Sequence, residues 1–459
     1  MGRTRMVVIG GDAAGMSAAS SARRRRPASD LEIVAFERGE HTSYSACGLP
    51  YLAGGVVEDW HDLVVRTPEQ FAEQDITAKV RHEVQAIDLD ARRVTVRDLD
   101  AGRTIREPFD ILVVATGSEP VRPPIPGIDL PGVYGLSILR DGIELRAAID
   151  AGPKAAVVIG GGYIGLEAAE QLVNRDVPTT LVEQTPQVMN QVDPDMGELV
   201  GKAVAGLGVT LYLEEEVEEI EAGDDGRVAA VRTSARTIPA DLVVLGLGSR
   251  PSVELAESAG IPVGPSGGIR VNRRMRTPVE GVWAAGDCAE TIHVVTGEPV
   301  NYHLGTIANK QGRICGTNIG GGYVTFPGVL GTAVTKVCDL EVARTGLGER
   351  DLGPLGIEAE SGTVESTTRA GYYPGAEQIH TKILAERRSG RLLGAQIVGR
   401  EGAAKRIDVL AAALWNGMTV HDLVNMDVSY APPFAPVWDP VLISARKLSE
   451  QITADLERC

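Results

Sequence analysis

The chain of 459 residues contains few cysteines, and none of them stands in a Cys-x-x-Cys pair. Their number is odd, so neither a disulfide framework nor a zinc site is indicated, and we expect no metal. This cysteine usage fits a reducing cytoplasm best. The five positions are Cys47, Cys288, Cys315, Cys338 and Cys459.

Long apolar runs are missing as well. No run reaches the roughly 18 residues that a membrane-spanning helix requires. The start of the chain, MGRTRMVVIGGDAAG, gives a strand and a glycine turn without a signal-peptide pattern. We therefore expect a soluble, unprocessed protein that does not associate with a membrane.

Net positive charge is also missing, because 45 lysines and arginines stand against 62 aspartates and glutamates, for a formal net charge of −17. Too few cations remain to replace the counterions of a nucleic acid, so no nucleic-acid partner is expected. The one basic cluster, Arg23 to Arg26, is either a solvated helix end or a phosphate-binding site.

Aromatic residues make up only 4% of the chain, whereas glycine is abundant, with 54 residues. The low aromatic content suits helix-on-sheet interiors filled by Ala, Val, Leu and Ile, which indicates the α/β class. The glycines cluster at strand-to-helix junctions. A chain of this length is expected to form two to four domains.

A βαβ pattern occurs twice, each time with a glycine turn between the first strand and the helix. Two such Rossmann-like halves predict two nucleotide cofactors, or one used structurally and one catalytically. The strand, helix and strand expected in the two copies are 6–9, 14–25 and 31–37, and then 155–159, 164–174 and 179–183.

Proline-rich segments mark the expected seams between domains. The stretch 117–127 follows an apolar strand and cannot be helical, and a second seam should fall near 262–268. From about Phe326 the chain alternates strands with one amphipathic helix, 403–415, and resembles neither βαβ half. The acidic stretch 213–226 is interpreted as a solvated strand edge and hairpin.

The second glycine turn carries a complete dinucleotide fingerprint. Gly160, Gly162 and Gly165 permit, in that order, the tight turn, the approach of a pyrophosphate and close packing of helix on strand. Glu183 ends the next strand and would accept hydrogen bonds from an unphosphorylated ribose. No arginine lies in 184–192, which favours NADH over NADPH, although NADPH remains possible.

The first glycine turn departs from this pattern. Gly10, Asp12 and Gly15 occupy the three fingerprint positions, and Glu37 is placed to bind ribose hydroxyls. A carboxylate at position 12 could crowd or repel a pyrophosphate, unless its side chain turns outward and leaves the approach to the backbone open.

The order of the motifs resembles a known family over the whole chain. A first fingerprint, an ATG turn within 111–120, a second fingerprint and a Gly286-Asp287 pair are similar to the FAD/NAD-linked pyridine nucleotide-disulfide oxidoreductases. The resemblance implies that the first fingerprint holds FAD and that Asp287 binds the ribityl chain of the flavin. It also implies a homodimer.

The same resemblance gives domains and cofactor contacts. We expect an FAD-binding domain made of 1–150 and 265–325, an NAD(P)H-binding domain in 151–264, and a C-terminal α+β dimerisation domain in 326–459. Tyr163 would swing aside to admit NADH, with Glu167 near the nicotinamide. The expected cofactor-binding residues are Gly10, Asp12, Ala13, Ala14, Gly15, Glu37, Arg38, Ser43, Ala115, Thr116, Gly117, Gly160, Gly162, Tyr163, Ile164, Gly165, Glu167, Glu183, Gly248, Gly286 and Asp287.

The catalytic signature of the family falls on 42–55. Two-cysteine members have cysteines separated by four residues there, but Leu52 and Thr42 occupy the two positions that could pair with Cys47, so an internal disulfide is excluded. If Cys47 lies at the start of a helix, the positive helix end and a nearby flavin would stabilise its thiolate. The thiolate could attack a disulfide or persulfide, or peroxide could oxidise it to a sulfenic acid.

Single-cysteine members include coenzyme A disulfide reductases, persulfide reductases, NADH oxidases and NADH peroxidases. The oxidases and peroxidases resemble one another in a histidine in the first glycine turn, where this chain has Ala13. The segments 371–375, 399–410 and 429–440 look like those of coenzyme A disulfide reductases. That branch is therefore favoured.

By this resemblance Tyr372 and Tyr430 are catalytic and reach the cysteine of the partner subunit, where a phenol can donate a proton to a leaving thiolate. Either could instead be a surface or dimer-core tyrosine. Ser21 stands where relatives carry a longer amide, and no His-Pro pair near the C-terminus supplies the acid of glutathione-reductase-like members. The expected substrate-binding residues are Arg24, Ser43, Lys405 and Arg406.

The favoured function is an FAD-dependent NAD(P)H:disulfide oxidoreductase with one redox-active cysteine, acting on coenzyme A disulfide or a related small disulfide or persulfide. One alternative is an NADH oxidase or peroxidase that cycles Cys47 through sulfenic acid. Others are a flavoprotein redox sensor and a ferredoxin reductase, which needs no cysteine at position 47.

Overall fold

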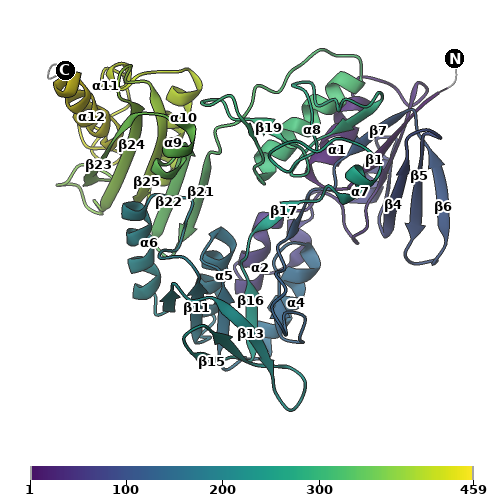
Figure 1. The fold of residues 1–459 in the computed structure, drawn as a ribbon, viewed down its shortest axis with the longest axis horizontal. Helices are drawn as coiled ribbons and strands as arrows, with labels where there is room; N and C mark the ends of the chain where they lie inside the picture. The colour runs from purple at the N-terminus through teal and green to yellow at the C-terminus, as the bar shows by residue number, and fades with distance from the viewer. Residues whose placement is uncertain (1–2, 457–459) are drawn as a thin grey trace.

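Three five-stranded sheets carry the fold, and the computed structural model describes residues 3–456. The first sheet lies at the right of Figure 1, the third at the left, and the second below and between them. Within residues 3–456, no helix is both long and apolar enough to cross a membrane, and no group of three or more His, Cys, Asp or Glu side chains could hold a metal ion.

The first sheet is parallel, with the order β18-β7-β1-β2-β3. Its strands are apolar and largely buried, as expected for a sheet covered on both faces. Because β18 pairs with β7, two parts of the chain separated by the second sheet share one core. The strands are β1 (Thr4–Ile9), β2 (Leu31–Phe36), β3 (Ile76–Lys79), β7 (Ile111–Val114) and β18 (Val282–Ala284).

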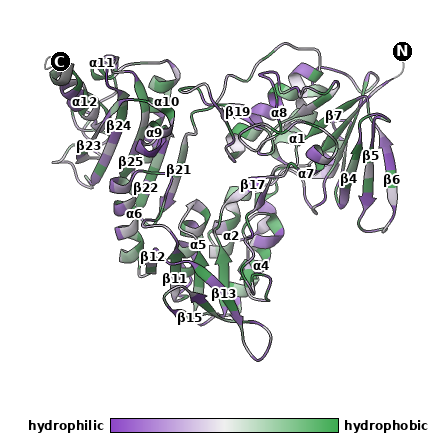
Figure 2. Cartoon of the chain, viewed as in Figure 1, coloured by the Kyte–Doolittle hydropathy of each residue, from purple (hydrophilic) through white to green (hydrophobic). Residues whose placement is uncertain are grey.

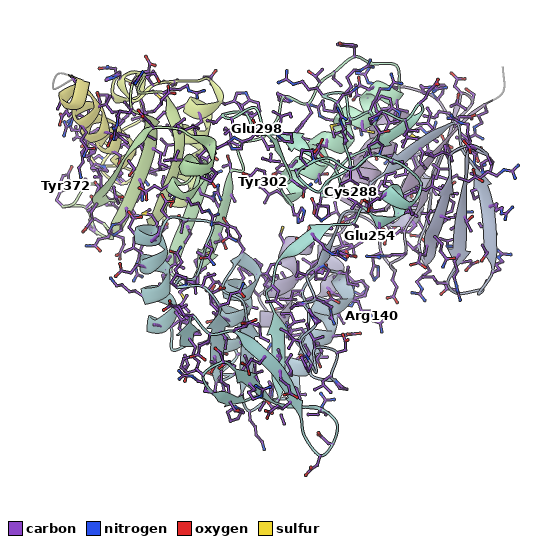
Figure 3. The ribbon with its side chains drawn as sticks, in the orientation of Figure 1. Arg140, Glu254, Cys288, Glu298, Tyr302 and Tyr372 are labelled. Atoms are coloured by element: carbon purple, nitrogen blue, oxygen red, sulfur yellow. The ribbon has the colours of Figure 1, made fainter. Side chains whose placement is uncertain are left out.

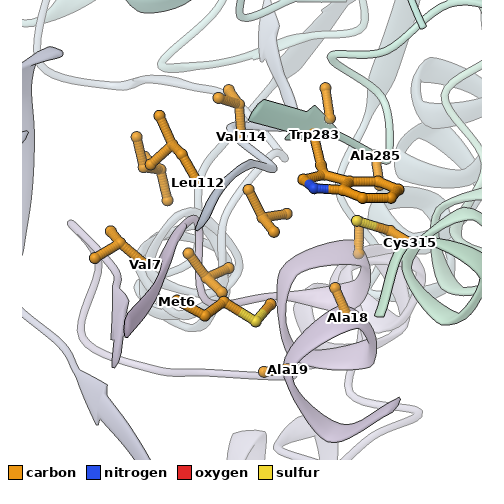
Figure 4. Close-up of a cluster of buried hydrophobic side chains, with 14 of the residues drawn as sticks. Met6, Val7, Ala18, Ala19, Leu112, Val114, Trp283, Ala285 and Cys315 are labelled. Carbon is orange, nitrogen blue, oxygen red and sulfur yellow. The ribbon is translucent and has the colours of Figure 1, made fainter. Parts of the chain in front are cut away.

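Two helices, α1 (Ala13–Arg23) and α8 (Gly305–Ile319), pack closely on each other beside this sheet (Figure 4). Glycines on α8 make the contact possible. A Cβ at Gly312 would lie 2.2 Å from a carbonyl oxygen of α1, and one at Gly316 would lie 2.0 Å from another. This crossing places α8 beside the first glycine turn, since α1 starts there.

Small antiparallel sheets flank the first one. The outermost strand, β6, alternates exposed and half-buried residues and is mostly hydrophilic in Figure 2. These elements are β4 (His82–Asp88), β5 (Arg93–Asp98) and β6 (Thr104–Pro108), with the pairs β8 (Ser118–Pro120) and β17 (Ser249–Pro251), and β19 (Thr291–Ile292) and β20 (Pro299–Val300).

The second sheet repeats the parallel design with the order β12-β11-β10-β16-β9. The acidic stretch 213–226 lies on a strand edge and hairpin next to it, as predicted, but it is not solvated throughout, because Glu215 is buried. The strands are β9 (Val133–Tyr134), β10 (Ala156–Ile159), β11 (Thr179–Glu183), β12 (Thr210–Leu213), β13 (Val217–Ala222), β14 (Val228–Thr233), β15 (Thr237–Pro239) and β16 (Leu242–Leu245), and the helices are α4 (Leu139–Asp150), α5 (Tyr163–Asn174), α6 (Pro194–Gly206) and α7 (Glu254–Ser258).

The third sheet is antiparallel, with the order β21-β22-β25-β24-β23. The domain limits 150/151, 264/265 and 325/326 stay predictions. The elements are β21 (Ala333–Val337), β22 (Leu340–Gly346), β23 (Ala359–Thr367), β24 (Gln378–Glu386), β25 (Leu392–Gly399), α9 (Glu349–Leu355), α10 (Ile407–Trp415), α11 (Val420–Val424) and α12 (Pro440–Leu456).

The prediction of one helix in this C-terminal part is wrong. The structure has α9, α11 and α12 besides α10, and residues 404–406 form a separate 3-10 turn. Helix α12 was not predicted, because its first residue, Pro440, ends a proline-rich stretch. Proline is nevertheless well suited to the first position of a helix. The apolar residues of α12 recur at helical spacing and are buried: Val441, Ala445, Leu448 and Ile452.

A buried ion cluster joins the second and third sheets. The Lys382 ammonium of β24 lies 3.1 Å from Asp193, 2.8 Å from Asp195 and 3.0 Å from Glu349. The side chains of Lys382 and Asp193 are only 4% and 3% exposed. Asp193 stands immediately before α6, so the cluster fixes the start of α6 against the C-terminal sheet.

Candidate active site

A cavity of about 2270 Å³ is lined by residues from all three sheets or their loops. Its walls include both glycine turns, the loop that holds Cys47, and β21. In Figure 3, Glu254 and Tyr302 mark positions on its wall, whereas Tyr372 lies far off at the edge of the third sheet. Most of the predicted cofactor-binding residues line the cavity, and the exceptions are Ala14, Gly15, Gly165 and Gly286.

The first glycine turn has the shape that a dinucleotide cradle requires. Gly10 has a φ of 105°, and a Cβ there would lie 2.0 Å from the Ala115 carbonyl oxygen. A Cβ at Gly15 would lie 2.0 Å from the Gly10 carbonyl oxygen, so glycine is required at both positions. The Gly11 amide donates to Glu37 Oε2 at 2.8 Å, which fixes the carboxylate beside the turn.

Asp12 does not turn outward to the solvent. It is the N-cap residue of α1, but its side chain makes no capping hydrogen bond. Instead its Oδ1 accepts a hydrogen bond from the Tyr44 amide at 3.2 Å, and the side chain lines the cavity. Burial and the nearby Glu37 raise the pKa of Asp12 to about 7.

The second glycine turn is built in the same way. Gly160 has a φ of 99°, and a Cβ at Gly165 would lie 1.9 Å from its carbonyl oxygen. Around Gly162 the space is open, since the nearest atom to a Cβ would be 3.8 Å away. Glu183 Oε2 accepts the Gly161 amide at 2.7 Å, as Glu37 does for Gly11. The residues of both turns therefore fit a dinucleotide each.

Two further carboxylates, Glu215 and Glu216, line the cavity in addition to Glu183, although they belong to the acidic stretch 213–226 that was predicted to be solvated. They follow β12, the strand next to β11 in the second sheet, and strand adjacency is decided only by the fold. Glu215 is paired with Arg236 at 2.8 Å, so Glu183 and Glu216 remain as the carboxylates here that could oppose a 2′-phosphate, and the preference for NADH stays a prediction.

Cys47 lies in a 3-10 turn, Ala46–Gly48, directly before the short helix α2 (Leu49–Gly54), and its side chain is exposed to the cavity. The protein groups alone do not lower its pKa. Partial burial and then Glu167 raise the pKa of Cys47, with smaller increases from Asp287 and Asp12. Loss of solvation is the largest cause, and the stabilisation of the thiolate by a nearby flavin stays a prediction.

The start of α5, where Tyr163 is expected to swing aside for NADH, contacts the third sheet through a hydrogen bond. Tyr163 and Glu167 both line the cavity. Thr335 of β21 donates to Glu167 Oε1 at 2.7 Å, and burial raises the pKa of Glu167. The position of Glu167 therefore depends on the packing of α5 against β21 as well as on the glycine turn.

Three polar residues gather around Asp287 without having been predicted. Ser118 donates to Asp287 Oδ2 at 3.1 Å, and Ser249 is hydrogen-bonded to His303 Nδ1 at 2.6 Å. Burial raises the pKa of Asp287, and the neighbouring His303 opposes the shift. No motif marks these residues, because β8, β17 and the residues before α8 meet only in the folded chain.

A second cavity, of about 420 Å³, lies at the end of α1. Its lining contains three arginines, Arg24, Arg25 and Arg313, together with Ser21 and Thr317, and no acidic residue. Arg24 donates to Ser21 Oγ at 2.9 Å. Arg24, Ser21 and Arg313 also line the large cavity, so the basic site and Cys47 share one space.

Arg23, the first residue of the basic cluster, has a different role. Its guanidinium donates to the carbonyl oxygens of Arg26, Leu31 and Asp75 at 2.8 to 3.0 Å. This side chain holds the loop after α1 in place, so only Arg24 and Arg25 of the cluster face the basic cavity.

Four predicted catalytic or substrate residues lie away from Cys47 of the same chain. Tyr372 and Tyr430 are 77% and 48% exposed, and a hydrogen bond to Tyr372 raises the pKa of Tyr430. Lys405 pairs with the nearby Asp408, and Arg406 donates to Asp439 at 3.0 Å and to backbone carbonyls. None of the four lines the cavity, and their roles stay predictions.

Comparison with known proteins agrees with this geometry. Residues 4–312 match the model of the pyridine nucleotide-disulphide oxidoreductases, and residues 332–440 match the model of their dimerisation domain. The NAD(P)H sulfur oxidoreductase (CoA-dependent) of Pyrococcus abyssi is 39% identical over 446 residues, which are 96% of this chain and 98% of that protein.

Two further similarities extend over the whole chain. The NADH oxidase of Methanocaldococcus jannaschii is 35% identical over 452 residues, 98% of this chain and 99% of that protein. The structure of a NAD-dependent persulfide reductase from A. fulgidus superposes with a TM-score of 0.95 at 38% identity, covering 98% of this chain and 84% of that one.

Proposed function

Because the chain belongs to the pyridine nucleotide-disulphide oxidoreductases, which use FAD and NAD(P)H, we propose that it reduces the disulfide or persulfide of a phosphate-bearing thiol, coenzyme A, through Cys47. The observation that carries the proposal is that Cys47 opens into the cavity that also contains both glycine turns and the Arg24–Arg313 site. Cys288 and Cys315, by contrast, are fully buried.

The chemistry needs one reactive sulfur. The Cys47 thiolate attacks the substrate disulfide, forms a mixed disulfide and releases one thiolate, which takes up a proton. The first glycine turn and Asp287 would hold FAD, which would supply the transfer of an electron pair from the hydride of NADH to the Cys47 sulfur. The second thiol then leaves, so that NADH, a proton and one disulfide yield NAD⁺ and two thiols.

The arginines support coenzyme A as the thiol. Its several phosphates need cations, and this acidic protein places Arg24, Arg25 and Arg313 around one cavity that contains no carboxylate. Arginine binds phosphate oxygens with paired, charge-assisted hydrogen bonds. Arg313 lines the same cavity as Ser21, whose side chain is shorter than the amide of the relatives.

Replacing Arg313 with glutamine should raise the KM for coenzyme A disulfide about tenfold or more while kcat changes little, because one charge-assisted hydrogen bond is lost. Pantethine, which has no phosphate, should show no change in KM. The matched control is Arg93→Gln, at an exposed arginine of β5 outside both cavities. Equal effects on both substrates would contradict a phosphate site.

The tyrosines complete the proposal across the dimer. Tyr372 and Tyr430 are exposed on the C-terminal domain, whose model is that of a dimerisation domain. They are hydrogen-bonded to each other, so one phenol can donate while the other accepts. We infer that this pair faces the active site of a second copy and supplies the proton to the leaving thiolate.

We also place the protein in the cytoplasm, since its four described cysteines are free.

The test of the function is NADH consumption without oxygen. We expect turnover with coenzyme A disulfide or its persulfide, slower turnover with pantethine, and none with peroxide. Mass spectrometry of the protein as isolated should find a coenzyme A adduct on Cys47. Turnover with peroxide alone would overturn the assignment.

An NADH oxidase is the second candidate, because the relative from M. jannaschii carries that name and Cys47 is accessible enough to be oxidised to a sulfenic acid. Ala13 argues against it, since it provides no proton donor in the first glycine turn. Oxygen-dependent NADH consumption, together with a sulfenic acid trapped on Cys47, would favour this reading.

A further inference from the structure

We propose that Asp12 binds the pyrophosphate of FAD as a neutral carboxylic acid that donates a hydrogen bond, so that FAD binding takes up one proton. The chain departs from the fingerprint at this one position, where a glycine normally lets the pyrophosphate approach the backbone. The inference goes beyond the proposed function, because it concerns how the cofactor is held and not what is reduced.

The geometry puts the Asp12 side chain where the phosphates must pass. Asp12 immediately precedes α1, a helix of eleven residues whose first amides point toward the cradle. An aspartate at an N-cap usually accepts an amide two or three residues further on, but Asp12 makes no such capping bond, and its carboxyl group accepts the Tyr44 amide and interacts with the adjacent Ala13 amide. The Ala14 and Gly15 amides of α1 therefore carry no bond from the Asp12 side chain, and the carboxyl group lies in the cavity beside the start of the helix.

The charged groups around Asp12 favour the protonated form. Glu37 faces it from the end of β2 and Asp287 from the loop after β18, and both raise the pKa of Asp12, as does burial. The Tyr44 and Ala13 amides act in the opposite direction, but they do not outweigh these effects. Two negative phosphates would add to the same repulsion, which falls away if Asp12 carries a proton.

Of the two carboxyl groups at this turn, Asp12 is the one free to hold the proton. Glu37 accepts the Gly11 amide at 2.8 Å through one oxygen and the Gly39 amide at 2.7 Å through the other. Asp12 accepts the Tyr44 amide at 3.2 Å, a longer bond than either of those to Glu37, and its one other amide contact is with the adjacent Ala13. Protonation of Glu37 would remove one of the two carboxylate oxygens that accept the Gly11 and Gly39 amides. Protonation of Asp12 would instead provide an O–H group that can donate to the pyrophosphate of FAD. The pKa of Asp12, raised to about 7, agrees with this assignment.

The sign of the pH dependence follows directly. If FAD binds the protonated form, its affinity is constant below the pKa of free Asp12 and falls about tenfold for each pH unit above it. With a pKa of about 7, the loss sets in near neutral pH. The second fingerprint has Gly162 at the corresponding position, so NADH binding should not show this loss.

The experiment measures FAD binding to the FAD-depleted protein between pH 6 and 9 by flavin fluorescence, for wild type, Asp12→Asn and Asp12→Gly. Wild type should lose about tenfold in affinity per pH unit above 7, and both variants should bind FAD with little pH dependence. At pH 8, calorimetry in buffers of different ionisation enthalpy should report uptake of one proton by wild type and none by Asp12→Asn. NADH binding in the same proteins is the internal control.

Superposable pH profiles of wild type and Asp12→Asn would overturn the inference while leaving FAD binding intact. So would release of a proton on binding. If a variant were misfolded, its circular dichroism would differ, and proton uptake by wild type alone would still decide the question. Failure of wild type to bind FAD at any pH would instead contradict the flavoprotein assignment itself.

Discussion

Replacing Cys47 with serine should abolish disulfide reduction, leaving less than about one thousandth of the wild-type rate, because a serine hydroxyl is not ionised near neutral pH and forms no mixed disulfide. No other described cysteine can take over. Cys288 and Cys315 are fully buried, and Cys338 contacts the Ala203 carbonyl oxygen, away from the cavity. The measurement is anaerobic consumption of NADH with coenzyme A disulfide.

The same variant separates the two halves of the reaction. NADH should still bleach the flavin absorbance of Cys47→Ser in a single turnover at close to the wild-type rate, because both glycine turns are untouched. Cys338→Ser is the matched control and should keep full turnover. If Cys47→Ser retained turnover with an acceptor, the chain would work as a ferredoxin-reductase-like enzyme that needs no cysteine.

Replacing Lys382 with methionine should give the largest loss of stability, about 3 kcal/mol, since it leaves Asp193, Asp195 and Glu349 without their shared cation. Although burial opposes it, hydrogen bonds to Asp195 and Glu349 raise the pKa of Lys382, so its contribution is fully present below the ordinary lysine pKa of 10.5 and is lost as the pH rises through the raised value. Thermal denaturation and amide exchange at the start of α6 measure the effect.

Two comparisons identify the cause. Lys202 lies on α6, the helix that carries Asp195, and forms an exposed ion pair with Glu198 at 2.7 Å. Lys202→Met should therefore lower the free energy of unfolding by less than about 0.5 kcal/mol. Adding Asp193→Asn to Lys382→Met should restore part of the stability, because one buried charge is removed. A loss as large for Lys202→Met as for Lys382→Met would show that the buried cluster has no special role.

The parallel sheets were predictable because their strands are continuous apolar runs with glycine turns behind them. The predicted bounds of strand 179–183 are those of β11 in the structure. The glycines of the second fingerprint also lie where the predicted tight turn and close helix-strand packing require them. The C-terminal part was predicted less well. Its helix α12 follows a proline-rich stretch and was missed, although its apolar residues recur at helical spacing and pack against β23 and β24.

The active site divides in the same way. Cys47 and the two fingerprints are contiguous motifs, so spacing along the chain was enough to find them. Arg313, His303 and Glu215 carry no motif and reach the cavity only because α8, the residues before it and the end of β12 converge there. Similarly, the pKa of Cys47 depends on Glu167 and Asp287, which lie far from it in the sequence.

The sequence by itself therefore determined the two dinucleotide cradles, the lone cysteine sulfur of segment 42–55 and the absence of a local disulfide, because each depends on backbone shape or residue identity within one short segment. The tertiary structure alone decided which charges surround that sulfur, which arginines gather near it and how Asp12 is turned. The physical reason is that electrostatic and hydrogen-bonding environments are set by distances in space, which in this fold join residues hundreds of positions apart.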